Sequence, residues 1–321
     1  MLCACSTPAL AETAGFGLPV DCAAAQTCFV QQYPDMQPGP GVLDPFCGTA
    51  TYDGHDGTDI RVLSLAGMGK GVPVISIAAG TVLRIRDGEP DRLVRTEADR
   101  RAVKDRECGN GLVVDHGGGF VAQYCHLRQG SVTVKSGDKL LKGQPFGLIG
   151  ASGNAEFPHV HVTIGKDGRV LEPSTGSPLE DGCIAEPNAR KPLWDAPALS
   201  WLSIADTPFL AIGLAGGALD HDRLVVDGPP PPPAGADGAL VGWGWFANLQ
   251  KNDRVRIVLK GSGGGVVIDR TTEALDAGKA SYSAFAGRKG APLPGNYLLR
   301  VELIRDGRPF DFREETFAVA P

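Results

Sequence analysis

Five side chains that could bind a metal or move a proton stand in three short motifs of this chain. His55 and Asp59 lie four residues apart, a spacing that puts both on one face of either a helix or a strand. His126 stands alone, whereas His159 and His161 alternate with valines. Such alternation is typical of a strand with one apolar face and one functional face. Two imidazoles and one carboxylate around a tetrahedral Zn²⁺, with the fourth position open to water, form a catalytic metal site.

These four histidines are among six in a chain of 321 residues, and all four lie in its first half or just beyond it. If two of them bind the metal, the other two are available to accept and donate protons, because an imidazole titrates near neutral pH. The sequence therefore predicts a hydrolytic metal centre in this part of the chain.

Composition limits the classes of function. The length allows two domains of ordinary size, and 42% hydrophobic residues can fill two cores. No segment approaches the roughly 20 consecutive apolar residues of a transmembrane span. The net charge of −6 argues against nucleic acid as a partner, because such a partner would require a basic surface. The oligomeric state stays open.

The eight cysteines indicate an oxidising compartment. Residues 1–11 resemble the remainder of a leader: residues 2–5 are similar to a lipoprotein processing box, and residues 9–11 to a signal-peptidase site. The charged and apolar regions that precede such sites are missing, so we expect the natural start to lie upstream. Beyond this leader stand six cysteines, an even number, as a disulfide framework requires. We expect a periplasmic or secreted protein, or an outer-membrane lipoprotein with its lipid anchor at Cys5.

One disulfide follows from the predicted strands. Residues 112–116 and 120–126 flank three consecutive glycines, a turn suited to a hairpin. This register places Cys108 near Cys125, so we predict a bridge between them, and the other pairings stay open. The bridge would close the charged segment 87–107 onto the strand that ends at His126. This segment is nearly neutral overall, and we expect a solvated loop or a short surface helix.

The pattern of the chain indicates an all-β protein. After the leader, residues 12–50 are predicted to form an N-terminal wrap held by disulfides. Residues 51–172 alternate short apolar strands with glycine turns and contain almost no long amphipathic helix, so we predict an antiparallel β-domain with the metal site. Besides the hairpin, its predicted strands are 72–79, 81–86, 131–134, 139–141, 146–149 and 159–164.

A second domain is predicted after a connector at residues 173–205. From residue 206 to residue 321 the alternation resumes, with predicted strands at 253–260, 266–270, 297–303 and 310–319 and a hairpin turn at 305–308. About seven short strands over this length are typical of an immunoglobulin-like β-sandwich. We interpret this domain as a targeting or scaffold module.

Taken together, the motifs resemble those of lysostaphin-type zinc metalloendopeptidases. The resemblance covers about residues 47–172, and although each motif alone is weak, their common order is specific. The matching positions are Gly-His55-Asp-Gly-Thr-Asp59, Pro73-Val74, Ala79-Gly80-Thr-Val82, Asn110, Val114-Asp-His116-Gly, Tyr124-Cys-His126-Leu, Gly143 to Gly150 and Pro158-His159-Val-His161.

The resemblance implies a fold, a cofactor and a role for each site residue. It implies an antiparallel lysostaphin-type peptidase β-domain in which His55, Asp59 and His161 bind Zn²⁺. It implies that His126 and His159 flank the water that the metal activates and act as acid and base. The reaction implied is hydrolysis of peptide bonds in the cross-bridges or stem peptides of bacterial peptidoglycan.

Three side chains near this pattern receive a structural interpretation. Asp56 neighbours the ligands but is expected to point away from them, as alternate residues of a strand do. His116 is interpreted as ordering the glycine turn, and His221 as a surface residue of the second domain. Many relatives carry an aromatic residue and an acid after the paired histidines, whereas this chain has Val162 and Thr163.

Three other functions stay open. A metal-free, non-catalytic protein that activates other cell-wall hydrolases would have lost metal ligands, whereas all three are present here. A zinc peptidase that acts on protein substrates fits the same motifs. A carbohydrate-binding or adhesive β-protein that binds the cell wall fits the second domain but leaves the histidines unexplained.

Overall fold

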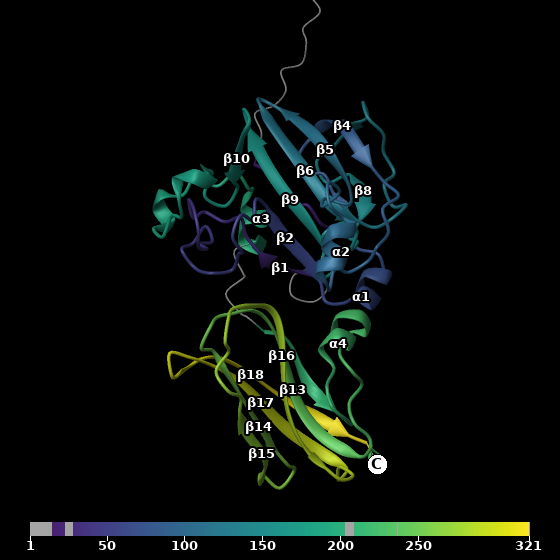
Figure 1. The fold of residues 1–321 in the computed structure, drawn as a ribbon, viewed down its shortest axis with the longest axis vertical. Helices are drawn as coiled ribbons and strands as arrows, with labels where there is room; N and C mark the ends of the chain where they lie inside the picture. The colour runs from purple at the N-terminus through teal and green to yellow at the C-terminus, as the bar shows by residue number, and fades with distance from the viewer. Residues whose placement is uncertain (1–14, 23–27, 203–208, 236, 321) are drawn as a thin grey trace, which may run out of the picture.

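Antiparallel sheets dominate the computed structural model, which describes residues 15–22, 28–202, 209–235 and 237–320 (Figure 1). A first unit, which ends with helix α3 (Ala196–Leu202), contains one large sheet, and a second unit, which begins with β12 (Phe209–Ala215), contains two smaller ones. The predicted all-β class is confirmed. The predicted leader with Cys5 lies outside the described residues. Within the described ranges, no helix has the length and hydropathy needed to cross a membrane.

The first unit is built on nine antiparallel strands in the order β1-β2-β9-β6-β5-β4-β7, with β10 paired to β9 and β11 paired to β10. A small sheet of β3 and β8 accompanies them. Because β2 pairs with β9, Asp59 lies directly opposite His161. The strands are β1 (Cys28–Gln32), β2 (Thr58–Val62), β3 (Pro73–Ile75), β4 (Gly80–Arg86), β5 (Asn110–Gly117), β6 (Phe120–Leu127), β7 (Lys139–Leu140), β8 (Pro145–Leu148), β9 (His159–Lys166), β10 (Arg169–Glu172) and β11 (Ser177–Pro178).

Alternation along β9 separates a core face from a functional face, as the sequence predicts. Val160 and Val162 are buried in the apolar core of the first unit, where Ile60 of β2 joins them. His159 and His161 therefore project from the opposite face of the sheet. His159 and His161 are thus carried by a strand whose valines are packed in the core.

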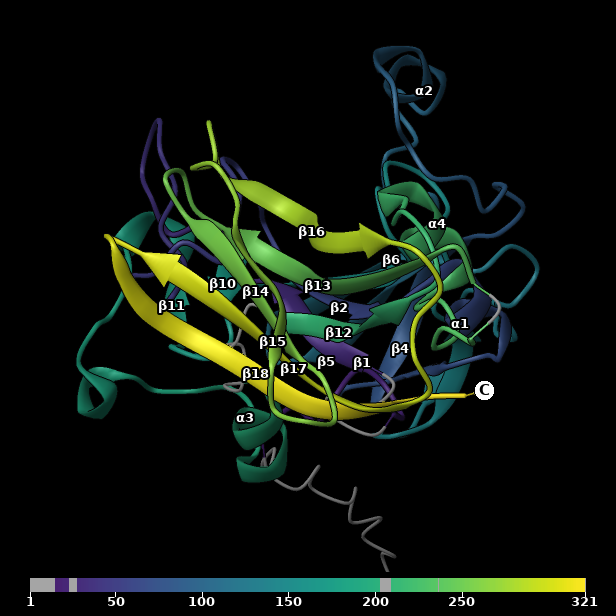
Figure 2. The same ribbon diagram turned by 90° about the horizontal axis from the view of Figure 1, so that it is seen from below.

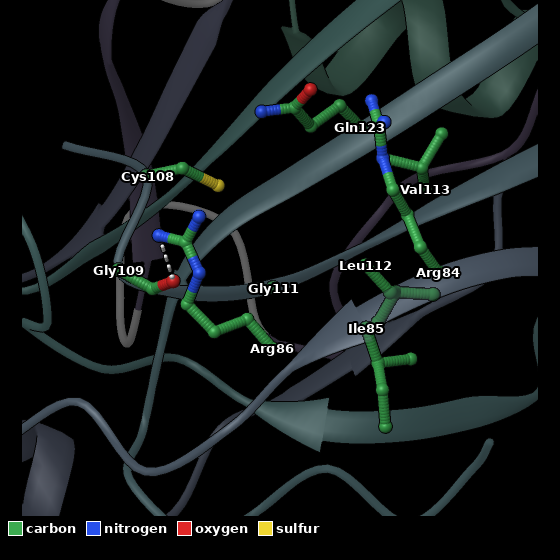
Figure 3. Close-up of a pocket in the computed structure, with 9 residues that line it drawn as sticks. All are labelled: Arg84, Ile85, Arg86, Cys108, Gly109, Gly111, Leu112, Val113 and Gln123. Carbon is green, nitrogen blue, oxygen red and sulfur yellow. Dashed lines mark hydrogen bonds between the residues drawn. The ribbon is translucent and has the colours of Figure 1, made fainter. Parts of the chain in front are cut away.

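The hairpin of β5 and β6 also forms as predicted. Its turn contains glycines 117–119, all with positive φ, a conformation that side-chain-bearing residues rarely adopt. The predicted disulfide between Cys108 and Cys125 is present. On the outer face of β4, β5 and β6 lies a cavity around Arg84, Arg86 and Gln123 (Figure 3).

The segments before and after the predicted peptidase domain contribute to the same unit. β1, from the N-terminal segment, pairs with β2. Disulfides Cys22–Cys28 and Cys47–Cys183 connect this segment to itself and to the segment 173–205. The latter segment includes the 3₁₀ helices η1 (Leu179–Asp181) and η2 (Pro187–Ala189), and its Trp194 is buried in the core. The predicted domain boundaries themselves stay a prediction.

One predicted strand is absent. Residues 131–134 form no strand, because other groups satisfy their backbone donors. The N–H of Val132 donates to the Asp87 carboxylate at 3.1 Å, and the N–H of Thr133 donates to the Phe146 carbonyl at 3.0 Å. The apolar pattern of residues 131–134 could not predict this outcome, because the Asp87 carboxylate that accepts from Val132 lies 45 residues away in the sequence.

Residues 87–107 form a largely exposed segment with one short helix, as the sequence predicts. The helix α2 (Glu97–Ala102) is capped by Thr96, whose side chain accepts from the N–H of Asp99 while the Asp99 carboxylate accepts from the N–H of Thr96. Figure 2 shows α2 standing away from the sheets.

The second unit consists of two antiparallel sheets, β12-β13-β16 and β15-β14-β17-β18. Buried side chains of both sheets, including Phe246 and Leu299, share one core. The predicted turn between β17 and β18 forms, with Asp306 and Gly307 at positive φ. An immunoglobulin-like sandwich stays a prediction. The strands after β12 are β13 (Ala239–Leu249), β14 (Arg254–Lys260), β15 (Val266–Thr271), β16 (Lys279–Lys289), β17 (Gly295–Arg305) and β18 (Arg308–Val319).

The two units pack against each other beside the strands that bear the predicted site. Trp243 and Trp245 of β13 form a buried cluster with Phe157, which lies two residues before the start of β9. Gln31 of β1 donates to the Ala280 carbonyl of β16 at 2.7 Å. Two short helices that the sequence did not predict, α1 (Leu65–Gly69) and α4 (His221–Asp227), also meet at this contact (Figure 1).

Candidate metal centre and active site

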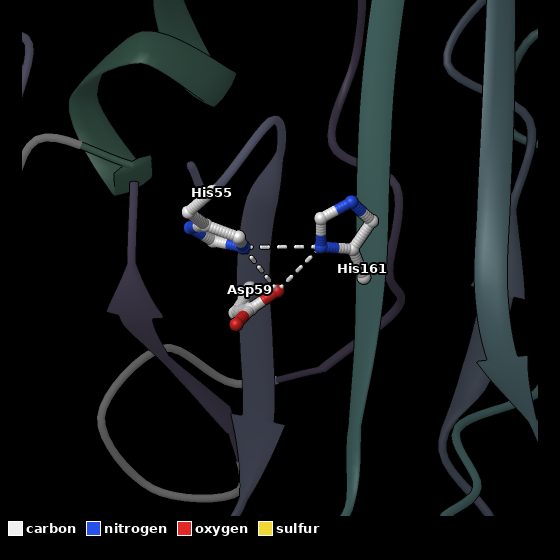
Figure 4. A group of neighbouring side chains, drawn as sticks. All are labelled: His55, Asp59 and His161. Carbon is white, nitrogen blue, oxygen red and sulfur yellow. Dashed lines mark hydrogen bonds and ion pairs between the residues drawn. The ribbon is translucent and has the colours of Figure 1, made fainter. Parts of the chain in front are cut away.

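Three potential metal ligands converge where β2 faces β9 (Figure 4). Asp59 Oδ1 lies 3.2 Å from His55 Nε2 and 2.9 Å from His161 Nδ1. The two histidine nitrogens are 3.1 Å apart. The structure therefore brings together the three residues to which the resemblance assigns the metal.

His55 reaches this centre from a turn, so the expectation that it shares a face of one regular element with Asp59 is wrong. The turn precedes β2, and Gly54 within it has a φ of +78°. A Cβ on Gly57 would lie only 2.5 Å from His161 Nε2, so glycine is needed there for the close approach of the backbone to that ring. A spacing of four residues was compatible with this turn but did not reveal it.

The hydrogen bonds around the ligand group direct acceptor atoms toward its centre. His55 Nδ1 donates to the Tyr33 carbonyl at 2.6 Å, which leaves a lone pair on Nε2. His161 Nε2 donates to Asp56 at 3.1 Å, which leaves Nδ1 facing Asp59. Tetrahedral Zn²⁺ holds ligands at about 2.0–2.1 Å and therefore about 3.3 Å from one another, close to the separations here. The three side chains fit a zinc ion.

Electrostatics favour a cation at this position. Burial would raise the pKa of the Asp59 carboxyl, but His55, His159 and the hydrogen bond from His161 hold that pKa well below its usual range. Burial would lower the pKa of His161, but hydrogen bonds with Asp56 and Asp59 raise it to about 9. Without a metal, His161 therefore keeps a proton at neutral pH, and a bound cation would replace it.

His126 and His159 lie beside the ligand group with their ring centres 4.5 Å apart. Their Nδ1 atoms donate to the carbonyl oxygens of Ser152 and Phe157, each at 2.8 Å, so each Nε2 presents a lone pair. The Nε2 of His159 lies 3.7 Å from Asp59 Oδ1. Burial lowers the pKa of both histidines, and His159 lowers that of His126 further. Both rings are therefore neutral at pH 7 and can accept a proton.

The backbone of His126 is held in an uncommon conformation. Its φ is +61°, a region that costs free energy for residues with a side chain and that persists where the surroundings enforce it. The His126 N–H donates to the Cys108 carbonyl at 2.8 Å, and Cys108 is bridged to Cys125, the residue before His126. The predicted disulfide thus supports the backbone that orients this imidazole.

A cavity of about 340 Å³ opens over Asp59, His126 and His159. Arg100 of α2 contributes to its wall, so the charged segment 87–107 does border the site. Ala280 of β16 also lines this cavity, which makes the second unit part of its boundary. The cleft is therefore assembled from three parts of the chain that are distant in sequence.

Two polar side chains at the site were not predicted. Asp56 was expected to point away from the ligands, which is wrong, because the turn before β2 directs it at His161 Nε2. Thr163, two residues after His161 on the same face of β9, places its hydroxyl 2.9 Å from the same nitrogen. The only available signal for Thr163 was its period-two relation to His161.

The two remaining histidines lie outside this centre. His116 donates from Nδ1 to the Ala79 carbonyl at 3.0 Å, which agrees with a structural interpretation. His221 begins α4, is half-buried rather than fully exposed, and contacts the Ser283 hydroxyl at 3.1 Å. Tyr52 stacks on His55, with ring centres 4.4 Å apart, and borders the cavity.

Arg61 connects the site to the second unit, a role that no sequence pattern predicted. It is fully buried and donates to the Gln31 side chain at 3.0 Å. Its guanidinium carbon lies 4.5 Å from the ring centre of Phe157 and 5.3 Å from that of Trp245. Because the Phe157 carbonyl accepts from His159 Nδ1, this stack supports the orientation of the His159 ring.

Residues 53–173 match the model of Peptidase family M23. Over 95 residues the chain is 34% identical to the peptidoglycan DD-endopeptidase ShyA of Vibrio cholerae, covering 29% of this chain and 21% of that protein. Over 137 residues it is 25% identical to an uncharacterized metalloprotease of Buchnera aphidicola, covering 43% of this chain and 29% of that protein. The chain thus spans less than a third of the length of these curated relatives.

Among solved structures, a zinc-containing peptidase from Vibrio cholerae matches with 24% identity and a TM-score of 0.29, covering 45% of this chain and 39% of that one. The sequence resemblance to lysostaphin-type peptidases is confirmed by the family match over residues 53–173.

Proposed function

We propose that this chain, whose residues 53–173 match the model of Peptidase family M23, is a zinc-dependent endopeptidase of bacterial peptidoglycan. The observation that supports this most strongly is the convergence of His55, Asp59 and His161, whose ligand atoms lie 2.9, 3.1 and 3.2 Å apart. Two imidazole nitrogens and one carboxylate oxygen are a ligand set of catalytic zinc sites, which keep one position open. A non-catalytic activator of other hydrolases would not need this set.

The proposed chemistry divides between the metal and two histidines. Zinc, when bound by His55, Asp59 and His161, polarises a carbonyl group and lowers the pKa of water toward 7. His126 and His159 are neutral at pH 7, so one of them accepts the proton of the attacking water. The protonated imidazole then supplies a proton to the nitrogen of the leaving amine. No serine or cysteine nucleophile is required.

The substrate and the location are part of the proposal. Peptidoglycan is favoured because ShyA, which matches part of the catalytic segment, is named a peptidoglycan DD-endopeptidase. Three disulfides are typical of proteins in an oxidising compartment, so we propose a periplasmic or secreted protein. A lipid anchor at Cys5 is a further proposal, which labelling with a fatty-acid probe would test.

The function is tested by incubating the zinc-loaded protein with isolated sacculi and identifying released muropeptides by mass spectrometry. We expect new peptide termini to appear, to disappear with a chelator and to return when zinc is added. A His159→Ala variant with normal zinc content should release far less. Cleavage of casein but not of sacculi would instead favour a protein substrate, and no release by the wild-type protein would contradict the proposal.

A further inference from the structure

We propose that Arg84 and Arg86 form a subsite for a carboxylate group of the substrate peptide. The proposal rests on the proposed function, because it concerns the peptide whose bond is cleaved. Both arginines belong to β4 and line the cavity on the outer face of the sheet, where Gln123 and the Cys108 sulfur also lie (Figure 3). This cavity is separate from the one over His126 and His159.

The strand register places this cavity in line with the metal centre. Thr163, whose hydroxyl contacts His161, faces Gln123 across β9 and β6. Gln123 faces Val113 across β6 and β5, and Val113 faces Arg84 across β5 and β4. Register partners share one face of a sheet, so these residues form a single row that leads from the metal ligand to the arginine.

The length of this row suits a short peptide. Arg84 is three strands away from Thr163, and strands lie about 4.8 Å apart, so the Cα separation is about 14 Å. An extended peptide advances about 3.3 Å per residue, so about four residues cover this distance. A peptide with its scissile bond at the metal can therefore reach the arginines with a carboxylate a few residues away.

Charge and donor geometry identify the ligand class. Arg84 and Arg86 are exposed, and neither forms an ion pair within the described part of the chain. The guanidinium of Arg86 donates to the Gly109 carbonyl at 3.3 Å and retains further donors. A guanidinium binds a carboxylate through two parallel N–H bonds, and chain ends and acidic side chains supply carboxylates in a peptide.

The test measures binding separately from cleavage. Calorimetry is done with the full, zinc-loaded chain carrying His159→Ala, so that the probe is bound without being hydrolysed. The probes are a cross-linked dimer of two peptidoglycan tetrapeptides with free carboxylates and the same dimer with these groups converted to carboxamides. Replacing Arg84 and Arg86 with alanine is expected to weaken binding of the carboxylate dimer about tenfold or more, and to leave binding of the carboxamide dimer unchanged.

The matched control for each single arginine replacement is Arg101→Ala, which removes one guanidinium charge from α2. Its side chain is 68% exposed and lies outside the cavity, so we expect no change with either dimer. An unchanged unfolding midpoint and zinc content show that each variant is folded. Equal weakening with both dimers, no weakening, or no binding by the parent protein would overturn the subsite. If binding follows the expected pattern but the wild-type protein cleaves no dimer, the proposed hydrolysis fails and the subsite stands.

Discussion

The guanidinium carbon of Arg61 lies 4.5 Å from the centre of the Phe157 ring, in an environment without solvent exposure. The Phe157 carbonyl oxygen accepts from His159 Nδ1. The ring centre of Trp245, in the second unit, lies 5.3 Å from the guanidinium carbon of Arg61. Neither the aromatic rings nor the amide of Gln31 carries a charge to neutralise the guanidinium. Arg61 is therefore stabilised by cation–π contacts and hydrogen bonds, and it connects the second unit to the segment that carries Phe157 and His159.

Truncation of Arg61 should destabilise the first unit. Arg61→Ala leaves a cavity and removes the donor to Gln31, so we expect a loss of about 3 kcal/mol in the free energy of unfolding. Urea unfolding monitored by tryptophan fluorescence measures this change. Arg101→Ala, at an exposed side chain, should stay within about 0.5 kcal/mol of the parent protein. Equal stability of the two variants would show that the stack contributes nothing.

Asp56 should tune zinc affinity although it is not a ligand. Its carboxylate accepts from His161 Nε2 at 3.1 Å and so increases the basicity of the opposite nitrogen. We expect Asp56→Asn to weaken zinc binding about 10- to 100-fold in a competition assay with a chromogenic chelator. Asp53→Asn, an exposed change three residues earlier, is the control and should have no effect. The same affinity in both variants would contradict this role.

What could be predicted from the sequence depends on how local each signal is. The alternation around His159 and His161 identified a strand and its functional face, and the glycine turn identified the hairpin and the bridge between Cys108 and Cys125. Each of these patterns lies within about 20 residues of the chain, where periodicity and turn chemistry determine the outcome.

Contacts between residues that are distant in the sequence could not be predicted from local patterns. Arg61 is surrounded by Phe157 and Trp245, which are distant in sequence, so no local pattern reveals that the charge is buried. The orientation of Asp56 depends on a turn rather than on a strand, and a strand was the wrong basis for predicting it. For the same reason the contact of the second unit with the cavity, through Ala280, had no sequence signal.

The disulfide next to His126 should affect both stability and activity. Cys108 and Cys125 are separated by 17 residues, and in the loop-entropy model removing their disulfide lowers the free energy of unfolding by about 3 kcal/mol. The Cys108→Ala/Cys125→Ala variant should also lose activity on sacculi, because the Cys108 carbonyl holds the backbone of His126. Thermal unfolding and muropeptide release are the two measurements. Full activity in a destabilised variant would show that the bridge does not position His126.

Zinc binding should stabilise the fold, and this effect should require the ligand group of His55, Asp59 and His161. Zinc at about 1,000 times its dissociation constant adds about 4 kcal/mol to the free energy of unfolding. We expect the melting temperature to fall with a chelator and to recover with zinc. Asp59→Ala should abolish this response, whereas Asp53→Ala should retain it. A zinc response that survives in Asp59→Ala would place the ion elsewhere.

The most direct test of the proposed zinc site is anomalous diffraction at the zinc edge from crystals of the zinc-loaded protein. We expect one strong peak at about 2.0–2.2 Å from His55 Nε2, Asp59 Oδ1 and His161 Nδ1. We also expect His126 and His159 to lie nearby without coordinating the ion. A peak at other side chains, or zinc bound without Asp59, would contradict the proposed site.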